Sequence, residues 1–288
     1  MITHVAQADE QRGRVVLWLG ASGEPQDTAV EAALCLAQAF QSEIESLFIE
    51  DRQLFDLAEL PFAREISLSG RRSRVLSAND LARDIQSHAS AVQRRVMARA
   101  RAADVTAKTR VVRAEPVTAL AQACAENGPW NVVTVGSPIR RGVETGLAEL
   151  FEAVHATTGI VVAGPKARRT HGPVIAVVEE LERVVPMMRA AERIATATGG
   201  DTRIWLLVHD QSHQDWIEGQ IRLALGAYAA IKLEVVDMTT HSAQDVARMM
   251  QREGAGFVIA RFGGRLAPEE ADVVPLAETL EGPLFLVR

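Results

Sequence analysis

The chain repeats one pattern imperfectly: a short apolar run, a small polar turn and an amphipathic helix. The pattern occurs at Arg14–Phe40 and again at Pro173–Ala197. Each copy continues to a closing apolar strand, Thr158–Gly164 in the first and Pro283–Arg288 in the second. Short apolar runs that alternate with helices predict βαβ units and a parallel sheet. The duplication therefore predicts two similar lobes about a pseudo-twofold axis, with ligand crevices at the carboxyl ends of the strands.

Five apolar runs in each half are expected as strands, and right-handed crossovers between them place helices on both faces of the sheet. The runs of the first half are Val15–Leu19, Ile44–Ile49, a run around Val111–Val112, Val132–Val135 and Ile160–Ala163. The runs of the second half are Val174–Val178, Ile204–Val208, Leu233–Val236, Phe257–Ala260 and Leu284–Val287.

One part of the first half has no counterpart in the second. Arg52–Ser77 is expected as a short helix followed by an irregular loop, and Ala78–Ala103 as one long helix with a single apolar stripe. Arginines gather in this part with few acids between them, and a local basic surface on an acidic protein attracts acidic partners. The residues proposed to contact an acidic protein partner are Arg83, Arg94, Arg95, Arg99 and Arg101. The alternative is a solvated outer face paired with acids of the other lobe.

These patterns divide the chain into four parts. Residues 1–13 are expected to be a flexible N-terminus, and residues 14–166 a first domain that includes the long basic helix. Residues 167–172 form a polar linker, and residues 173–288 form a shorter second domain.

Composition narrows the class of protein. The 288 residues are 48% hydrophobic and 24% charged, as in folded globular domains, and the net charge of −6 argues against a nucleic-acid binder. The start of the chain has no apolar core of a secretory signal, and no apolar run approaches the roughly 20 residues that span a bilayer. Cys35 and Cys124 lie in apolar helical patterns, so we expect buried, reduced thiols and a cytoplasmic location.

Six segments carry a family resemblance. They are VVLWLGASGEPQDTAVEAALCLAQAF, NVVTVGSPIRRG and TGIVVAG in the first half, and VIAVVEELERVVPMMRAAERIA, IWLLVHD and GPLFLVR in the second. Together they resemble the tandem universal stress protein family over nearly the whole chain. The resemblance implies two flavodoxin-like, HUP-type α/β domains related by a pseudo-twofold axis, each with an open parallel five-stranded sheet and helices on both faces. It also implies a cytoplasmic protein with a role in stress responses.

Some members of that family bind ATP through an Asp at the end of the first strand and a G-x-x-G-x9-G-S/T loop after the fourth. Glycines in such a loop let backbone N–H groups approach phosphates. Here Ala21 stands at the Asp position, and Gly136 matches the first loop glycine. Ile139 replaces the second glycine, and Glu149-Leu150 replace the final Gly-Ser/Thr pair.

In the second half Glu179 stands at the Asp position, but Arg261-Phe262-Gly263-Gly264 does not restore the loop. Neither half has an intact ATP signature, so no cofactor is expected, with ATP or another adenine nucleotide kept as an alternative. The candidate ligand-binding residues lie at the strand ends: Gly20, Ala21, Ser22, Gly136, Ser137, Arg140, Arg141, Gly142 and Glu179.

Other chemistry finds less support in the sequence. His209, Asp210 and His213 suit a metal by residue type, but they lie in one polar loop with no fourth ligand nearby, so no metal site is expected. The chain contains no G-x-S-x-G, Walker loop or G-x-G-x-x-G, and no residue is assigned a catalytic role.

The expected function is that of a non-catalytic, universal-stress-protein-like regulator or adaptor that binds a partner or a small ligand. The alternative is an adenine-nucleotide sensor with at most slow ATPase activity, and a third reading is an α/β enzyme for another small ligand. Ile160–Ala163 and Leu284–Val287 are expected to pair within one chain and leave a monomer. If the first lobe pairs with another chain instead, a homodimer results.

Overall fold

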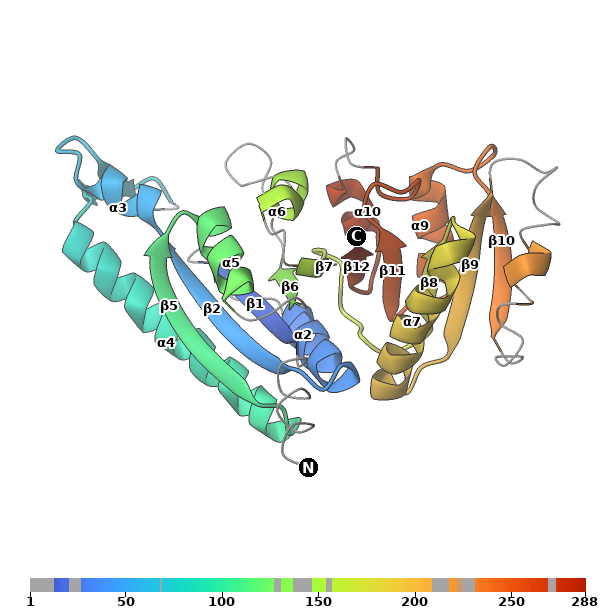
Figure 1. The fold of residues 1–288 in the computed structure, drawn as a ribbon. Coiled ribbons are helices and arrows are strands. Elements are labelled where there is room, and N and C mark those ends of the chain that lie inside the picture. The colour runs from blue at the N-terminus through green and yellow to red at the C-terminus, as the bar shows by residue number, and fades with distance from the viewer. Residues whose placement is uncertain are drawn as a thin grey trace, which may run out of the picture.

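The computed structural model describes residues 13–20, 27–67, 69–126, 131–136, 147–153, 157–208, 218–221, 223, 231–268 and 273–288. Within this part of the chain, ten strands form one sheet in the order β10-β9-β8-β11-β12-β7-β6-β1-β2-β5 (Figure 1). The expected flexible segment 1–13 falls outside the described residues except for Gly13.

The ten strands fall into two groups of five neighbouring strands, one from each half of the chain, and these groups form the two sides of the sheet. On one side lie β1 (Arg14–Gly20), β2 (Glu43–Asp51), β5 (Ala107–Ala114), β6 (Asn131–Gly136) and β7 (Thr157–Ala163), all parallel to their neighbours on that side. On the other lie β8 (Val174–Val178), β9 (Thr202–Val208), β10 (Lys232–Asp237), β11 (Phe257–Arg261) and β12 (Leu284–Val287), again parallel. Each predicted strand is present, with its ends moved by a few residues at most positions.

The two sides join through one antiparallel pair. β7 pairs with β12 so that Leu284 lies opposite Val162 and Val287 opposite Gly159. Of the two alternatives for the closing strands, the structure has the pairing within one chain. The parallel strands on either side therefore belong to one continuous sheet, whose outer edges are β5 and β10.

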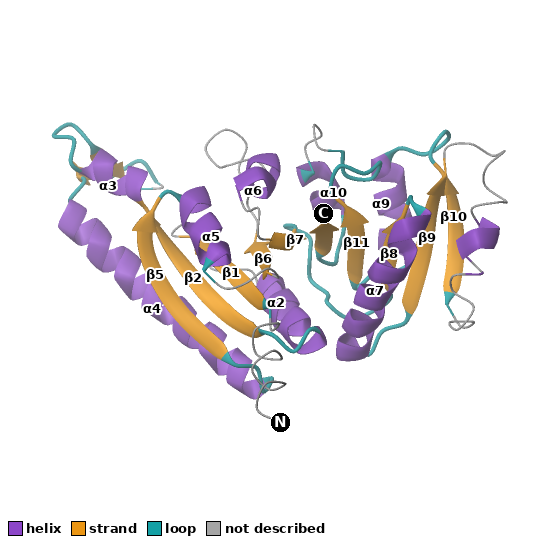
Figure 2. Cartoon of the chain, in the orientation of Figure 1, coloured by secondary structure: helices purple, strands orange, loops and turns teal. Residues whose placement is uncertain are grey.

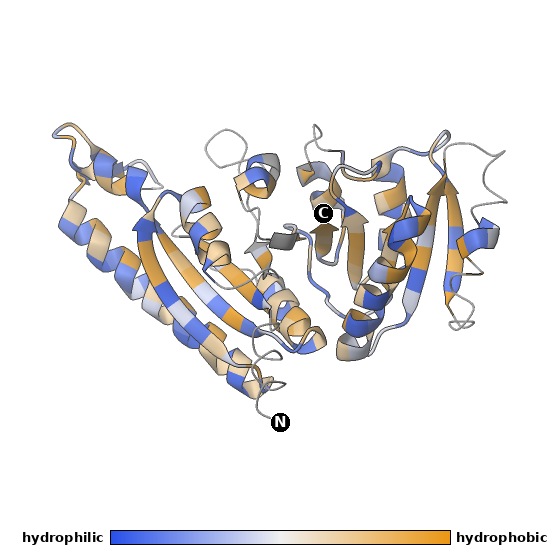
Figure 3. Ribbon diagram, in the orientation of Figure 1, coloured by the Kyte–Doolittle hydropathy of each residue, from blue (hydrophilic) through white to orange (hydrophobic). Residues whose placement is uncertain are grey.

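Helices cover both faces of the sheet (Figure 2). Buried side chains of α2 (Asp27–Ala39), α4 (Ala78–Ala102) and α7 (Val184–Thr198) share one core cluster. Buried side chains of α5 (Pro116–Ala125), α6 (Leu147–Ala153), α9 (Ala243–Arg252) and α10 (Val274–Thr279) share the other. The central strands are buried on both faces, and Figure 3 shows them as mainly hydrophobic. Burial on both faces explains why the sequences of these strands are continuous apolar runs rather than alternating apolar and polar residues.

The long helix predicted after the insertion is confirmed as α4. Its N-cap is Ser77, whose side chain accepts a hydrogen bond from the Asp80 amide, and its stripe of Ile85, Ala89, Val92, Val96 and Ala100 is buried. The stripe follows the three- and four-residue steps of one helix face, which is why the sequence pattern located it correctly.

The insertion before α4 differs from expectation in one respect. The short helix is present as α3 (Arg52–Ala58), but the predicted irregular loop is a two-stranded hairpin of β3 (Arg64–Ile66) and β4 (Ser73–Val75). Its turn is closed by the Gly70 amide, which donates to the Ser67 carbonyl, with Gly70 at φ +66°. Both strands are three residues long and exposed, so their sequences show no alternation of apolar and polar residues.

The polar linker is held in place rather than free. The Thr28 hydroxyl of α2 donates to the Ala167 carbonyl at 2.7 Å, and Ala29 packs with Ala163 and Ala167. At the other end, Arg169 forms an ion pair with Glu281. A hydrogen bond from Gln251 and the charge of Arg169 hold the pKa of Glu281 below its ordinary value.

A substitution at Gly159 tests the close pairing of β7 with β12. A Cβ atom at this position would lie 2.4 Å from the Leu286 carbonyl oxygen and 2.6 Å from a ring carbon of Phe285. We expect Gly159→Ala to force β7 and β12 apart and to lower the free energy of unfolding by about 1–3 kcal/mol, measured by urea denaturation.

Gly219→Ala is the matched control, because a Cβ atom there meets nothing within 4 Å and the residue is helical. That substitution is expected to leave stability unchanged or to raise it slightly. Equal stability of Gly159→Ala and the parent protein would contradict the tight β7–β12 pairing.

Candidate functional site

The carboxyl ends of the parallel strands are where the sequence places a ligand site. β1 pairs with β6 from Arg14–Asn131 to Trp18–Val135, so Gly20 and Gly136 close neighbouring strands. The other candidates of the first half lie outside the described residues: Ala21, Ser22, Ser137, Arg140, Arg141 and Gly142. The structure thus brings the two strand ends together as expected for a crevice.

In the second half the equivalent strand end is occupied by a side chain of the protein. Glu179 follows β8, and its carboxylate accepts hydrogen bonds from the Arg265 amide at 2.8 and 2.9 Å. It also accepts one from the Leu266 amide at 3.4 Å. These amides belong to the loop after β11, the loop in which phosphate-binding amides are expected from the resemblance. A carboxylate of the chain itself therefore satisfies the N–H groups that an external anion would use.

The loop after β11 is built tightly around this carboxylate. Gly263 has φ +80°, and a Cβ atom on Gly264 would lie 2.8 Å from Glu179 Oε1. Arg261 forms an ion pair with Glu180, and the Phe262 ring stacks on Phe151 with ring centroids 4.2 Å apart. Gly263 and Gly264 thus allow the loop to close on Glu179. This packing accounts for the two glycines in a loop that lacks the phosphate-binding motif.

The five arginines proposed to bind a partner do not form one free surface. Arg99 forms ion pairs with Asp27 and Glu31 of α2 at 2.9 Å, and Arg83 pairs with Asp80 at 3.2 Å. The acids that hold Arg99 lie on the same side of the sheet, not in the other lobe, which corrects the alternative reading. Arg94 and Arg101 line a polar hollow of about 390 Å³ beside β5, and Arg95 has an interaction of its own.

An apolar surface that sequence reasoning missed lies at one end of α4, on α3 and the β3–β4 hairpin (Figure 1). Phe62 is 75% exposed and Ile66 is 66% exposed. Most of the large exposed hydrophobic side chains among the described residues belong to this segment, which we call the insertion surface: Leu54, Leu57, Leu60, Phe62, Ile66 and Val75. No motif marks it, because only the fold shows that these side chains lack a core to enter.

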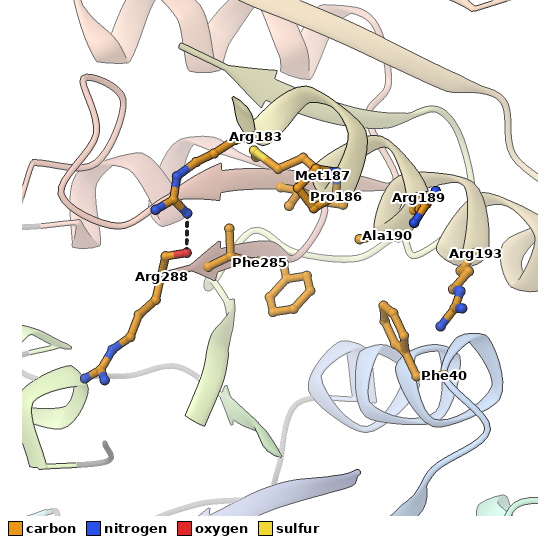
Figure 4. A pocket seen from close by; sticks show the side chains of 11 residues that line it. Phe40, Arg183, Pro186, Met187, Arg189, Ala190, Arg193, Phe285 and Arg288 are labelled. Atoms are coloured by element: carbon orange, nitrogen blue, oxygen red, sulfur yellow. Dashed lines mark hydrogen bonds between the residues drawn. The ribbon is translucent and has the colours of Figure 1, made fainter. Parts of the chain in front are cut away.

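A second feature missed from the sequence is a cavity of about 400 Å³ where the two sides of the sheet meet. We call it the junction cavity (Figure 4). It lies between the end of α2, the first turns of α7, and β12. Both apolar and cationic side chains line it: Phe40, Arg183, Pro186, Met187, Arg189, Ala190, Arg193, Ile259, Phe285, Val287 and Arg288. The residues that line the cavity come from widely separated parts of the chain, so no spacing in the sequence predicts it.

Thiol and metal chemistry find no site in the described part of the chain. Burial raises the pKa of Cys35 to about 11, although a hydrogen bond with Thr170 acts in the opposite direction. Cys124 is fully buried. Among the described residues no group of three His, Cys, Asp or Glu side chains is placed to hold a metal ion. His209, Asp210 and His213 lie outside those residues. Every described helix is too short or too polar to cross a bilayer.

Removing the Glu179 carboxylate tests its place in the loop. Glu179→Ala leaves the Arg265 and Leu266 amides without their acceptor, so we expect a loss of about 1–3 kcal/mol in the free energy of unfolding. Sulfate is expected to restore part of this loss at matched ionic strength, because the freed amides form an anion site. Thermal unfolding in sulfate and in chloride measures both effects.

Glu180→Ala is the control, because the exposed Glu180 carboxylate pairs with the half-buried side chains of Arg183 and Arg261. Glu180→Ala is expected to lower the free energy of unfolding by at most about 1 kcal/mol. Sulfate is expected to stabilise this variant no more than it stabilises the parent protein. A Glu179→Ala protein as stable as its parent, or one indifferent to sulfate, would show that the carboxylate does not fill an anion position.

The raised pKa of Cys35 predicts slow alkylation in the native protein. A shift from 9.0 to about 11 reduces the thiolate fraction near neutral pH about a hundredfold. Iodoacetamide is therefore expected to modify Cys35 at about pH 8 only after guanidinium unfolding, as read by peptide mass spectrometry. Equal rates in native and unfolded protein would contradict this environment.

No protein-family model and no curated protein matches the chain, but solved structures do. A universal stress protein from Archaeoglobus fulgidus DSM 4304 matches with a TM-score of 0.59 at 15% identity, covering 97% of each chain. A provisionally assigned universal stress protein from Pseudomonas aeruginosa UCBPP-PA14 matches with 0.56 at 13% identity, covering 97% of this chain and 94% of that one. The cytoplasmic domain of a prokaryotic cation chloride cotransporter matches with 0.55 at 9% identity, covering 96% and 95%. The chain thus has the α/β fold of universal stress proteins, a fold that other proteins also use.

Proposed function

We propose that this chain is a universal-stress-protein-like regulatory protein of two pseudo-twofold-related domains that acts in stress responses by binding a protein partner through the insertion surface. The fold likeness supports the first part of this proposal. The Glu179 carboxylate, which accepts the loop amides after β11, supports a role that does not depend on phosphate binding in the second half. The exposed apolar side chains of the insertion are the observation that carries the docking role.

The insertion surface is unusual for an isolated protein. Large contiguous apolar patches on soluble proteins mark interaction sites, because leaving them in water is unfavourable. In the hairpin, the register sets Arg64 opposite Val75 and Ile66 opposite Ser73. Ile66 and Val75 therefore share one face. Glu65 and Arg74 lie opposite each other on the other face and form an ion pair at 2.5 Å. One face of the hairpin thus carries the exposed apolar side chains of Ile66 and Val75 together with Arg64 and Ser73, and the other carries the Glu65–Arg74 ion pair. The exposed apolar side chains suit the first face to contact a partner.

The charge around this face indicates the chemistry of that partner. Arg71 and Arg72 lie in the hairpin turn, and their guanidinium groups have no ion pair to any residue that the structure describes. Arg74 is already paired with Glu65. Two uncompensated cations beside exposed apolar side chains complement a segment that presents apolar side chains flanked by carboxylates. The proposed occupant is therefore an acidic, amphipathic protein segment.

Photo-crosslinking in the native cell tests this role. A photoreactive residue at Phe62 is expected to capture a protein, and the crosslinked peptide is expected to be apolar with flanking Asp or Glu. The same residue at Arg252, exposed on α9 of the opposite face, is the control and is expected to capture nothing specific.

Charge reversal then tests the electrostatic part. Arg71→Glu with Arg72→Glu is expected to lower the crosslink yield at Phe62 about tenfold, because each lost charge pair removes complementarity. Equal capture at Phe62 and Arg252, or capture of lipid or of a second copy of the chain, would overturn the docking proposal. An unchanged yield in the charge-reversed protein would overturn the acidic class of partner.

Adenine-nucleotide sensing is the second candidate, and one observation favours it. Gly20 and Gly136 close neighbouring strands, as a crevice in the first half requires. Under this alternative, ATP raises the melting temperature through linkage to binding. Our proposal expects no shift beyond that produced by an equal concentration of inorganic triphosphate.

A further inference from the structure

We propose that the junction cavity binds a small organic anion with an apolar body, at a site whose lining includes neither Glu179 nor any residue of the insertion surface. The site would be completed only when the two sides of the sheet are packed together. The proposal rests on the lining of the cavity, on the charge around its rim and on its position in the fold.

The inner part of the cavity is apolar and formed by buried side chains. Met187, Ile259 and Phe285 are all buried, and they present methyl, methylene and ring surface to the space. The Phe285 ring from β12 and the Phe40 ring from the end of α2 lie on either side of the space beside Ala190 (Figure 4). A volume of about 400 Å³ falls in the range of pockets that bind small molecules. A ring system or a short alkyl chain thus fits between the two phenylalanines.

The rim of the cavity is cationic. Arg183 is committed within the protein, since it donates to the Arg288 carbonyl and pairs with Glu180 at 3.4 Å. Arg189 and Arg193 are exposed, and neither has an ion pair to a residue that the structure describes. The Arg193 guanidinium lies 5.8 Å from the centre of the Phe40 ring, and both residues line the cavity.

Arg189 and Arg193 are four residues apart on α7, so they lie on the same side of the helix and repel each other. An anion held between them removes this repulsion and forms charge-assisted hydrogen bonds with both guanidinium groups. A carboxylate, sulfonate or phosphate monoester provides the acceptor geometry that arginine recognises. An inorganic anion would leave the apolar part empty, and a neutral apolar molecule would leave the arginines unpaired.

The position of the cavity links ligand binding to the packing of the two sides. Phe40 belongs to the first half of the chain, whereas α7, β11 and β12 belong to the second. α2 and α7 are in direct contact, and the linker covers another part of α2 through Thr28 and Ala167. A bound molecule would touch both halves at once, so it would stabilise their packed arrangement.

A pair of dyes tests this site. The probe is 1-anilinonaphthalene-8-sulfonate, which combines an aromatic body with an anionic group, and N-phenyl-1-naphthylamine has the same body without the charge. We expect the parent protein to bind the sulfonate about tenfold more tightly than the neutral dye, as a charge-assisted contact with arginine implies. Fluorescence titration measures both affinities.

Three variants separate the contributions. Arg189→Glu with Arg193→Glu is expected to weaken binding of the sulfonate about tenfold or more and to leave the neutral dye nearly unchanged. Arg248→Glu with Arg252→Glu is the matched control, an exposed pair at the same spacing on α9 of the opposite face. It carries the same change in net charge and is expected to leave both affinities unchanged. Ala190→Trp fills the cavity and is expected to weaken both dyes.

Each result of these dye titrations either supports or overturns the proposal. Ala190→Trp reports on the cavity even if the insertion surface also binds the dyes, because that surface lies far from α7 in the sheet order. Equal losses in the two charge-reversed pairs would show that only net charge matters, and would overturn the proposal. Full affinity for both dyes in Ala190→Trp would overturn it as well. The exposed arginine pairs provide the test if the tryptophan variant does not fold.

Discussion

The antiparallel pairing of β7 with β12 is the contact on which the rest of this structure depends. It converts two runs of parallel strands into one sheet, and it uses the strand edges that would otherwise be open to other chains. The pairing is close enough that Gly159 has no room for a side chain opposite Leu286. It also sets α2 beside α7 on one face, and without that contact the junction cavity would not exist.

The two halves use this shared framework differently. In the second half, the Glu179 carboxylate accepts hydrogen bonds from the Arg265 and Leu266 amides of the loop after β11. In the first half, the insertion between β2 and β5 carries the exposed apolar side chains, at the outer end of the sheet. The uncompensated arginines of the hairpin turn and of α7 belong to the insertion and to a helix, not to the loop after β11 that closes on Glu179. The chemistry of this chain thus favours binding at sites outside the crevices of its fold.

The sequence predicts the strands and the long helix well, because buried parallel strands and a one-sided apolar stripe leave clear patterns. The strands Val174–Val178 and Leu284–Val287 have the predicted bounds. The hairpin at Arg64–Val75 was missed because its short exposed strands have no apolar period. Glu179 was identified by position, but its role required the loop geometry. The junction cavity was out of reach, since Phe40, Arg193 and Phe285 meet only through tertiary packing.

The central claim is that this chain binds through surfaces other than a nucleotide crevice. Mass spectrometry of small molecules released from the natively purified protein tests it most directly. The account predicts that adenine nucleotide is absent or far below one molecule per chain, and that any ligand recovered in stoichiometric amount is an organic anion with an apolar body. One adenine nucleotide per chain, retained through purification and lost when Gly136 is replaced by valine, would contradict it.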